Sequence, residues 1–197
     1  VFEALGIPQA PMRFVPTSED APEGASEIGY PVAVKIVSAD LPHKTEAGGV
    51  ILGVDDSVGV NAATESIRRR IAVDNPDAKV EGYLLQRMES GLAEVLLGYR
   101  VDYLVGPTVV LGMGGVLAEI YKDASLRLAP IGLTEAHEMI EEVSGLAMIR
   151  GYRSMPKGDL DGLADAIVAI SKLALVEGPT VVEAEVNPVI VKHDSIV

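Results

Sequence analysis

The sequence contains no cysteine, so disulfide bonds, thiolate chemistry and cysteine-ligated zinc sites are excluded. Its apolar runs are all shorter than the roughly 20 residues that a membrane-spanning helix requires, and its N-terminus shows no signal-peptide pattern. Basic residues are outnumbered, because 16 lysines and arginines stand against 29 acidic residues and leave a net charge of −13. We therefore expect a cytoplasmic protein that binds no membrane and no nucleic acid, although a local basic pocket is compatible with this charge.

Several catalytic patterns are also missing. The chain has no Ser-His-Asp order, no HExxH motif and no histidine pair at metal spacing, which gives hydrolase and zinc-enzyme interpretations little support. What it has is 197 residues with 48% hydrophobic content, enough for one globular domain or two small lobes. The first residue is valine, so we expect a piece of a longer protein or a chain without its disordered ends.

The most informative segment is Tyr30–Val54, in which a polar loop separates two apolar runs. The first run, Val32–Val37, is predicted to be a strand, and Lys35 is the one charge in its middle. An unpaired buried ammonium group is costly, so Lys35 needs a partner. The loop His43–Gly49 offers an imidazole, an ammonium group, a hydroxyl and two flexible glycines, which together suit a triphosphate. The alternative is that Lys35 extends to solvent and the loop is an ordinary hairpin connection.

Three segments have the apolar periodicity of helices: Ser57–Val73, Thr134–Val143 and Asp159–Val176. Thr134 and Asp159 are the expected N-caps of the last two, because their side-chain oxygens can accept from free N–H groups of the first turn. Three consecutive arginines, Arg68–Arg70, lie in the first helix. A solvated helix face explains them more simply than a phosphate patch does, because at least two of the three must point outward.

The last predicted strand, Thr180–Lys192, alternates polar and apolar side chains. Glu183, Glu185 and Asn187 are expected on one face of it, because successive side chains of a strand point to opposite sides. Carboxylate and carboxamide oxygens are ligands that suit Mg²⁺. An exposed, merely solvated strand face is the equally simple alternative.

Four blocks of this chain, in order, resemble one known family. The blocks are PVAVKIV with HKTEAGGV, LLQRMESGLAEVLLG, GPTVVLGMGGVLAEIYKDASLRLAPI, and EAEVNPVIV. They are similar to the ATP-grasp domain of NDP-forming acyl-CoA synthetases, the family of the beta subunit of ADP-forming acetyl-CoA synthetase. The resemblance runs from about residue 7 to residue 197. It implies an α+β fold in which two lobes, each with a mixed or antiparallel sheet and flanking helices, clamp a nucleotide.

The resemblance also implies roles for individual residues. Residues 1–88 would form the phosphate-side lobe and residues 89–197 the ribose and metal side. The implied nucleotide contacts are Lys35 and Lys44 on the phosphates, Gln86 and Met88 on the adenine-reading hinge strand, and Glu94 near the ribose. Glu185 and Asn187 would bind Mg²⁺. Two departures bear on this set: the family usually has Glu where Gln86 stands, and a second metal carboxylate usually follows the EVNP motif, beyond Val197 of this chain.

The implied activity is an ADP-forming acid–thiol ligase reaction that uses ATP or ADP with Mg²⁺. A phosphohistidine on a CoA-binding domain or alpha subunit would carry the phosphoryl group here, and we expect an oligomer in the full-length form. His43 would relay that group, as a transient phosphohistidine or as an electrostatic guide, or else only hold the loop by a hydrogen bond.

Two other functions are compatible with such a domain. One is a carboxylate–amine ligase that uses an acyl-phosphate, which the HKTEAGGV and GMGG blocks disfavour. The other is a non-catalytic nucleotide-sensing module of a protein acyltransferase. The joint presence of Lys35, His43, Glu185 and Asn187 disfavours this second function.

Overall fold

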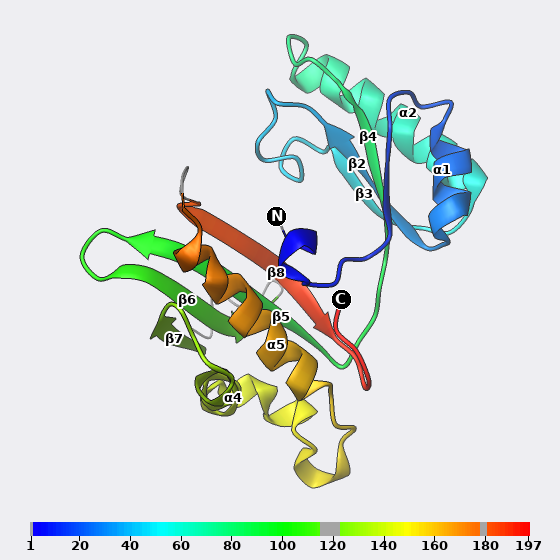
Figure 1. Cartoon of the computed structure of the whole chain (residues 1–197). Coiled ribbons are helices and arrows are strands. Elements are labelled where there is room, and N and C mark those ends of the chain that lie inside the picture. The colour runs from blue at the N-terminus through cyan, green and yellow to red at the C-terminus, as the bar shows by residue number, and fades with distance from the viewer. Residues whose placement is uncertain (1, 115–122, 178–180) are drawn as a thin grey trace. The chain divides into compact units, whose positions relative to one another are not determined.

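The computed structural model describes residues 2–114, 123–177 and 181–197. The chain divides into two compact units, one formed by Ala10–Glu89 and the other by Val1–Gln9 together with Ser90–Val197 (Figure 1). Each unit combines a four-stranded antiparallel sheet with helices, so the predicted α+β class is confirmed. The predicted boundary at residue 88 assigns residues 1–9 to the first lobe, whereas the structure groups them with Ser90–Val197. The roles assigned to the two lobes stay predictions.

The unit Ala10–Glu89 has the strand order β1-β4-β2-β3. Its elements are β1 (Met12–Val15), α1 (Ala21–Ile28), β2 (Val32–Val37), β3 (Val50–Val54), α2 (Ser57–Asp74) and β4 (Gly82–Arg87).

Both helices of this unit pack on one face of its sheet. Alternate residues of the central strands, such as Val34, Ile36 and Leu85, are buried against Ala25 of α1 and Ile67 of α2. Asp56 begins α2 by accepting the N–H of Gly59 at 2.7 Å. Because strand side chains alternate, the residues between these core positions lie on the face that the helices do not cover.

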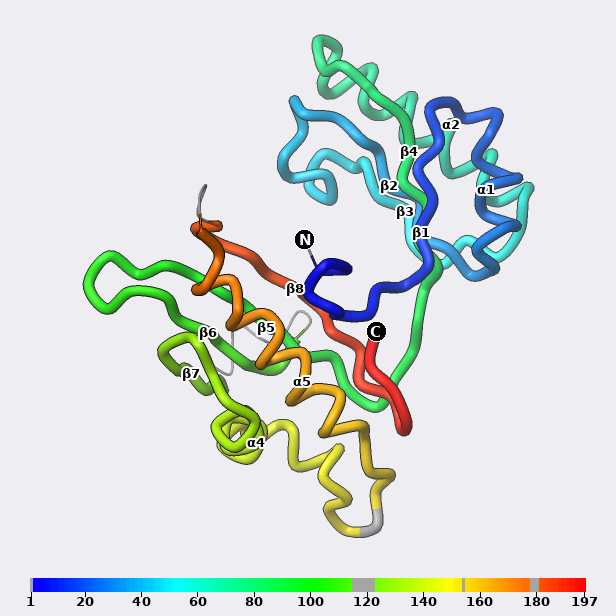
Figure 2. Tube along the Cα trace, in the orientation of Figure 1, coloured from blue at the N-terminus to red at the C-terminus, as the bar shows by residue number. Residues whose placement is uncertain are grey.

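The second unit has the strand order β7-β6-β5-β8, and its parts can be followed along the chain in Figure 2. Its elements are η1 (Glu3–Leu5), β5 (Ala93–Asp102), β6 (Gly106–Met113), β7 (Ala124–Leu128), α4 (Leu133–Glu142), η2 (Ser144–Ile149), η3 (Tyr152–Ser154), α5 (Leu160–Ser171), η4 (Lys172–Leu175) and β8 (Glu183–Val191).

The core of the second unit joins α4 and α5 to one face of this sheet. Leu97, Leu111 and Ile167 are among the fully buried side chains there. Asp159 caps α5 as predicted, with its carboxylate accepting the N–H of Gly162 at 2.9 Å. The prediction that Thr134 caps the other helix is wrong. Gly132 occupies that N-cap position and Leu133 is the first helical residue. Gly132 has no side chain that could cap the helix, and its own N–H donates to the Glu135 carboxylate at 3.1 Å.

None of the described helices is both long and apolar enough to cross a membrane. Near the N-terminus, Glu3–Leu5 form a single 3-10 turn that ends at Gly6. The central part of the GMGGVLAEIYKD block, and the predicted start of the last strand at Thr180, lie outside the described residues.

Candidate nucleotide and metal site

Lys35 and Gln86 meet on the open face of the first sheet, which is the face away from α1 and α2. In the pairing of β2 with β4, Ala33 is opposite Gln86 and Lys35 is opposite Leu84, so the two polar side chains are diagonal neighbours. The ammonium group of Lys35 donates to Oε1 of Gln86 at 2.6 Å. The predicted phosphate contact and the predicted adenine-side residue are therefore joined directly, although 51 positions separate them in the sequence.

The charge of Lys35 is not neutralised by this contact, because the Gln86 carboxamide is neutral. Within the described part of the chain no ion pair is made by Lys35 or Lys44. Burial lowers the pKa of Lys35 below its usual value, and the nearby positive charge of Lys44 lowers it further. Two neighbouring cations without a carboxylate partner are the electrostatic arrangement that a bound polyanion would relieve.

The loop His43–Gly49 is a single helical turn closed by a Schellman motif. The N–H of Gly49 donates to Lys44 O at 2.7 Å, that of Gly48 to Thr45 O at 3.0 Å, and that of Ala47 to His43 O at 3.1 Å. Gly48 has φ +71, the left-handed conformation that this motif requires. The sequence suggested two flexible glycines that donate to phosphate. In the structure both glycine N–H groups are used inside the turn. The side chains of His43, Lys44 and Thr45 remain as donors of the loop.

Met88 lies just beyond β4 and is hydrogen-bonded to the residue that precedes β2 and to the edge strand β3. Its N–H donates to Pro31 O at 2.8 Å, and its sulfur accepts the N–H of Gly53 at 2.9 Å. These contacts fix the segment that follows Gln86. The adenine-reading role of Met88 stays a prediction.

The open face of the second sheet carries carboxylates. Val95 and Leu97 face the core, so Glu94 and Gly98 of the same strand face the other way. Glu185 is opposite Gly98 and shares that face, roughly 13 Å along the strands from Glu94 at about 3.3 Å per residue. The carbonyl of Glu94 also accepts the N–H of Gly114 at 2.8 Å.

Asn187 lies where the pairing of β8 with β5 shifts by one residue. Leu97 pairs with Val186 while Val95 pairs with Val189, so Asn187 and Pro188 together oppose Leu96. The bulge moves the core-facing positions from even to odd numbers after Asn187, which leaves Glu185 and Asn187 exposed on the same face.

These two oxygen donors fit Mg²⁺ in the form in which nucleotide enzymes usually hold it, with one or two protein ligands and the rest supplied by phosphates and water. Among the described residues no cluster of three or more acidic or histidine side chains forms a metal cage of its own. A metal on this strand would therefore depend on the nucleotide for its remaining ligands.

The predicted site residues thus fall into two groups. Lys35, His43, Lys44, Gln86 and Met88 belong to the unit Ala10–Glu89, and Glu94, Glu185 and Asn187 belong to the other. Sequence analysis missed the apolar surface beside Lys35. Met12 is opposite Gln86 and Phe14 is opposite Leu84, and their side chains are 44% and 50% exposed. The alternation of Met12 and Phe14 with Arg13 was the available signal, since an apolar side chain on an open face suits a flat ligand.

Comparison with known proteins identifies relatives over the whole length of the chain. The ATP-grasp domain family matches residues 1–197. Acetate–CoA ligase [ADP-forming] I of Archaeoglobus fulgidus is 41% identical over 189 residues, which are 96% of this chain and 27% of that protein. The beta subunit of acetate–CoA ligase [ADP-forming] I of Pyrococcus furiosus is 36% identical over 195 residues, which are 99% of this chain and 84% of the subunit.

Two solved structures of similar proteins are also of an acetyl-coenzyme A synthetase. Acetyl-coenzyme A synthetase 1 of Ca. Korarchaeum cryptofilum, in complex with coenzyme A, Ca-AMPCP and HgCl+, has a TM-score of 0.90 at 33% identity, covering 99% of this chain and 85% of that one. The same protein with coenzyme A and Mg-AMPPCP, its phosphohistidine segment pointing towards the nucleotide binding site, has a TM-score of 0.82 at 31% identity, covering 99% and 84%. The chain spans about a quarter of its single-chain relative and most of the separate beta subunit.

Proposed function

Because this chain belongs to the ATP-grasp family, we propose that it is the nucleotide-binding part of an ADP-forming acyl-CoA synthetase. The whole enzyme converts an acyl-CoA, ADP and phosphate into the free acid, CoA and ATP, and runs in reverse. The part described here passes the phosphoryl group between a phosphohistidine and the nucleotide. The relatives named as ADP-forming acetate–CoA ligases support this reaction class.

One observation carries the proposal: Lys35 and Lys44 lie close together without a carboxylate partner in the described part of the chain, and Lys35 is held by the neutral Gln86. Nucleotide phosphates would supply the missing negative charge. Phosphoryl transfer requires mainly positioning and charge stabilisation, which two oriented cations provide. The apolar side chains of Met12 and Phe14 on the same open face would contact the base.

Glu185 and Asn187 would hold Mg²⁺, which supplies further positive charge to the phosphates when bound. Glu94 would accept from a ribose hydroxyl. His43, on the turn beside Lys44, would take part in the relay of the phosphoryl group. A neutral imidazole is a competent acceptor, and the turn leaves its side chain exposed.

The CoA-binding and phosphohistidine-bearing part would lie on an alpha subunit or elsewhere in a longer chain. Both arrangements occur among the relatives, as a separate beta subunit and as a single chain of which this sequence matches about a quarter. We expect the complete enzyme to be an oligomer.

Titration calorimetry of this chain with ADP, ATP and GTP, each with and without Mg²⁺, tests the nucleotide site. Saturable binding of an adenine nucleotide that strengthens with Mg²⁺ is the expected result. Absence of any nucleotide binding would contradict the proposal. Product analysis of the complete enzyme with CoA and with amines as acceptors then distinguishes the thioester-forming reaction from a carboxylate–amine ligase.

A further inference from the structure

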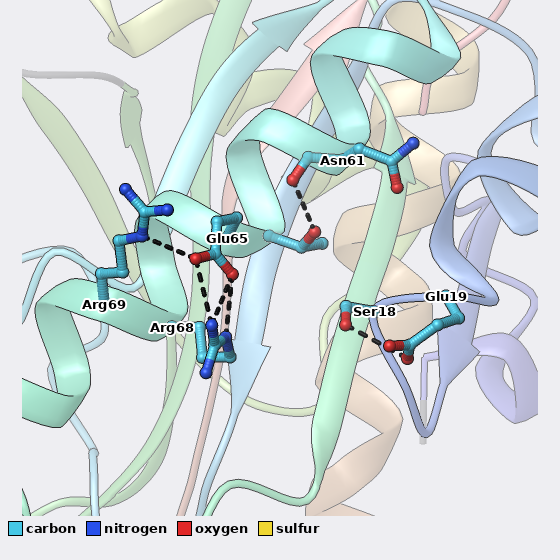
Figure 3. Close-up of polar contacts among 7 residues, drawn as sticks. Ser18, Glu19, Asn61, Glu65, Arg68 and Arg69 are labelled. Atoms are coloured by element: carbon cyan, nitrogen blue, oxygen red, sulfur yellow. Dashed lines mark hydrogen bonds and ion pairs between the residues drawn. The ribbon is translucent and has the colours of Figure 1, made fainter.

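The three consecutive arginines of α2 behave differently from one another. Arg68 and Arg69 both converge on Glu65 (Figure 3), with Nη2 of Arg68 2.8 Å and Nε of Arg69 2.6 Å from its carboxylate. These are exposed ion pairs within one helix, and such pairs contribute little to the stability of the fold. Arg70 makes no hydrogen bond or ion pair within the described part of the chain, although it lies on the same exposed stretch of the helix.

Arg70 instead lies against the His43–Gly49 turn. A β-carbon added at Gly48 would clash with Cδ of Arg70 and would lie 2.8 Å from its Nη1 and 2.9 Å from its Nε. The stem and the guanidinium plane therefore cover the backbone of Gly48. This close approach requires a residue without a β-carbon at position 48, because a β-carbon there would displace the end of the Arg70 side chain.

We propose that Arg70 is the positioning residue of the His43–Gly49 turn, which it holds against α2 so that His43 and Lys44 keep one orientation. This inference rests on the proposed function, because it assigns the turn the task of presenting those two side chains to phosphate. Leu41, which precedes the turn, and Gly49, which ends it, are both buried and hold the two ends of the loop in place. Arg70 covers Gly48, which lies between these two ends and nearer the surface.

The turn is too short to be stable by its own hydrogen bonds, since isolated helical turns do not persist in water. Without the Arg70 cover, ordering of the backbone of the turn would have to accompany phosphate binding, and this entropic cost would weaken the affinity. The cost applies to ligands that contact the turn. It does not apply to the nucleoside, which would lie against the sheet.

The test compares Arg70→Ala with Arg70→Lys and Arg70→Met, which keep a long stem, and with the matched control Arg69→Ala on the same helix. We expect Arg70→Ala to weaken the affinity of the chain for Mg–ATP roughly tenfold, as the ordering cost implies. Adenosine affinity should be unchanged. The Lys and Met variants should recover most of the loss, and Arg69→Ala should resemble the wild type.

Backbone ¹⁵N relaxation of Gly48 and Gly49 is the second measurement, and it needs no ligand. Arg70→Ala should lower their order parameters while leaving those of β2 unchanged. The contact itself is tested by a double-mutant cycle. Gly48→Ala would displace the end of the Arg70 side chain and is strained at positive φ. Its effect on stability should therefore be smaller in the Arg70→Ala background, where only the backbone strain remains.

The outcomes separate this inference from the proposed function. Unchanged ATP affinity and unchanged glycine order in Arg70→Ala would overturn the positioning role, as would an equal loss for adenosine or a failure of both long side chains to restore binding. A wild-type chain that binds no nucleotide would instead overturn the proposed function. In that case the order parameters still decide whether Arg70 holds the turn.

Discussion

The two sheets of this protein are built alike but carry opposite charge on their open faces. Each is a four-stranded antiparallel sheet with its helices on one side. The open face of the first sheet presents Lys35, with Lys44 close by, whereas that of the second presents Glu94 and Glu185. The architecture therefore does not determine the ligand chemistry. The ligand chemistry depends on the side chains that alternate with the core residues. On the first sheet these would suit phosphates, and on the second they would suit a metal ion and hydroxyl groups.

The largest effect is expected at the turn of the first unit. In the complete enzyme, His43→Asn should lower phosphoryl transfer to ADP by about a hundredfold or more, because the amide keeps a donor but accepts no phosphoryl group. Acyl-CoA-dependent phosphorylation of the CoA-side histidine should persist. Rapid-quench assays of each half-reaction measure both steps, with His137→Asn as a control. Near-normal ATP formation would leave His43 as a residue that only holds the loop.

Removing the central cation of the first sheet should have the next largest effect. Lys35→Met should weaken ATP binding by about 1–3 kcal/mol, or roughly fivefold to 150-fold, because a charge-assisted contact to phosphate is lost. Lys79→Met, an exposed lysine of the same unit, serves as the control for net charge. Calorimetry measures the affinities, and equal affinity in Lys35→Met and wild type would remove the phosphate role of this face.

The complementary change on the second sheet should affect the metal. Combining Glu185→Gln with Asn187→Leu should abolish the strengthening of nucleotide binding by Mg²⁺ and leave metal-free binding intact, since both proposed protein ligands are lost. Glu183→Gln, two residues away on the same strand, is the matched control. If the double variant shows the wild-type Mg²⁺ titration, this strand face is only solvated.

A smaller effect is expected when the charge of the first sheet is altered without removing Lys35. Gln86→Glu introduces the residue that the related family usually has here and should convert the 2.6 Å hydrogen bond into an ion pair. If the unpaired charge of Lys35 is what attracts the nucleotide to this chain, binding should weaken roughly threefold to tenfold, equivalent to about 1 kcal/mol. Gln86→Ala removes the hydrogen bond without adding charge and should weaken binding less. Tighter binding in the Glu variant would show that the positive character of this face is not what attracts the nucleotide.

The smallest effect concerns stability and pH. Because the pKa of Lys35 is lowered by burial and by Lys44, the unfolded chain binds more protons at this position than the folded one. The stability of the wild type relative to Lys35→Met should therefore rise with pH, from the lowered pKa of the folded state up to the usual lysine pKa of 10.5. Urea unfolding at a series of pH values measures this difference, and a difference that is independent of pH would contradict the uncompensated charge of Lys35.

Local patterns in the sequence predicted the main elements well. The run Val32–Val37 is a strand with the predicted bounds, and the second apolar run of that segment forms β3, Val50–Val54. The helix predicted over Ser57–Val73 ends one residue later. Such elements can be predicted from the sequence because the periodicity of apolar residues and the residues that begin or end a helix or strand depend only on near neighbours in the chain. The prediction that Thr134 is an N-cap was wrong because α4 begins at Leu133, one residue before Thr134, and Gly132 is in the N-cap position.

The sequence by itself determined the family, through four blocks in order, and the chemical type of the candidate site residues. Only the tertiary structure decided which of them meet. The register of β2 and β4 brings Lys35 to Gln86. Asn187 lies on the same face as Glu185, although a bulge shifts the pairing of the strand after it. Arg68 and Arg69 pair with Glu65, whereas Arg70 lies over Gly48. Each of these contacts joins segments that are distant in the chain or depends on a shift in pairing, and a local pattern cannot encode such relations because a one-residue change in register reverses every side chain.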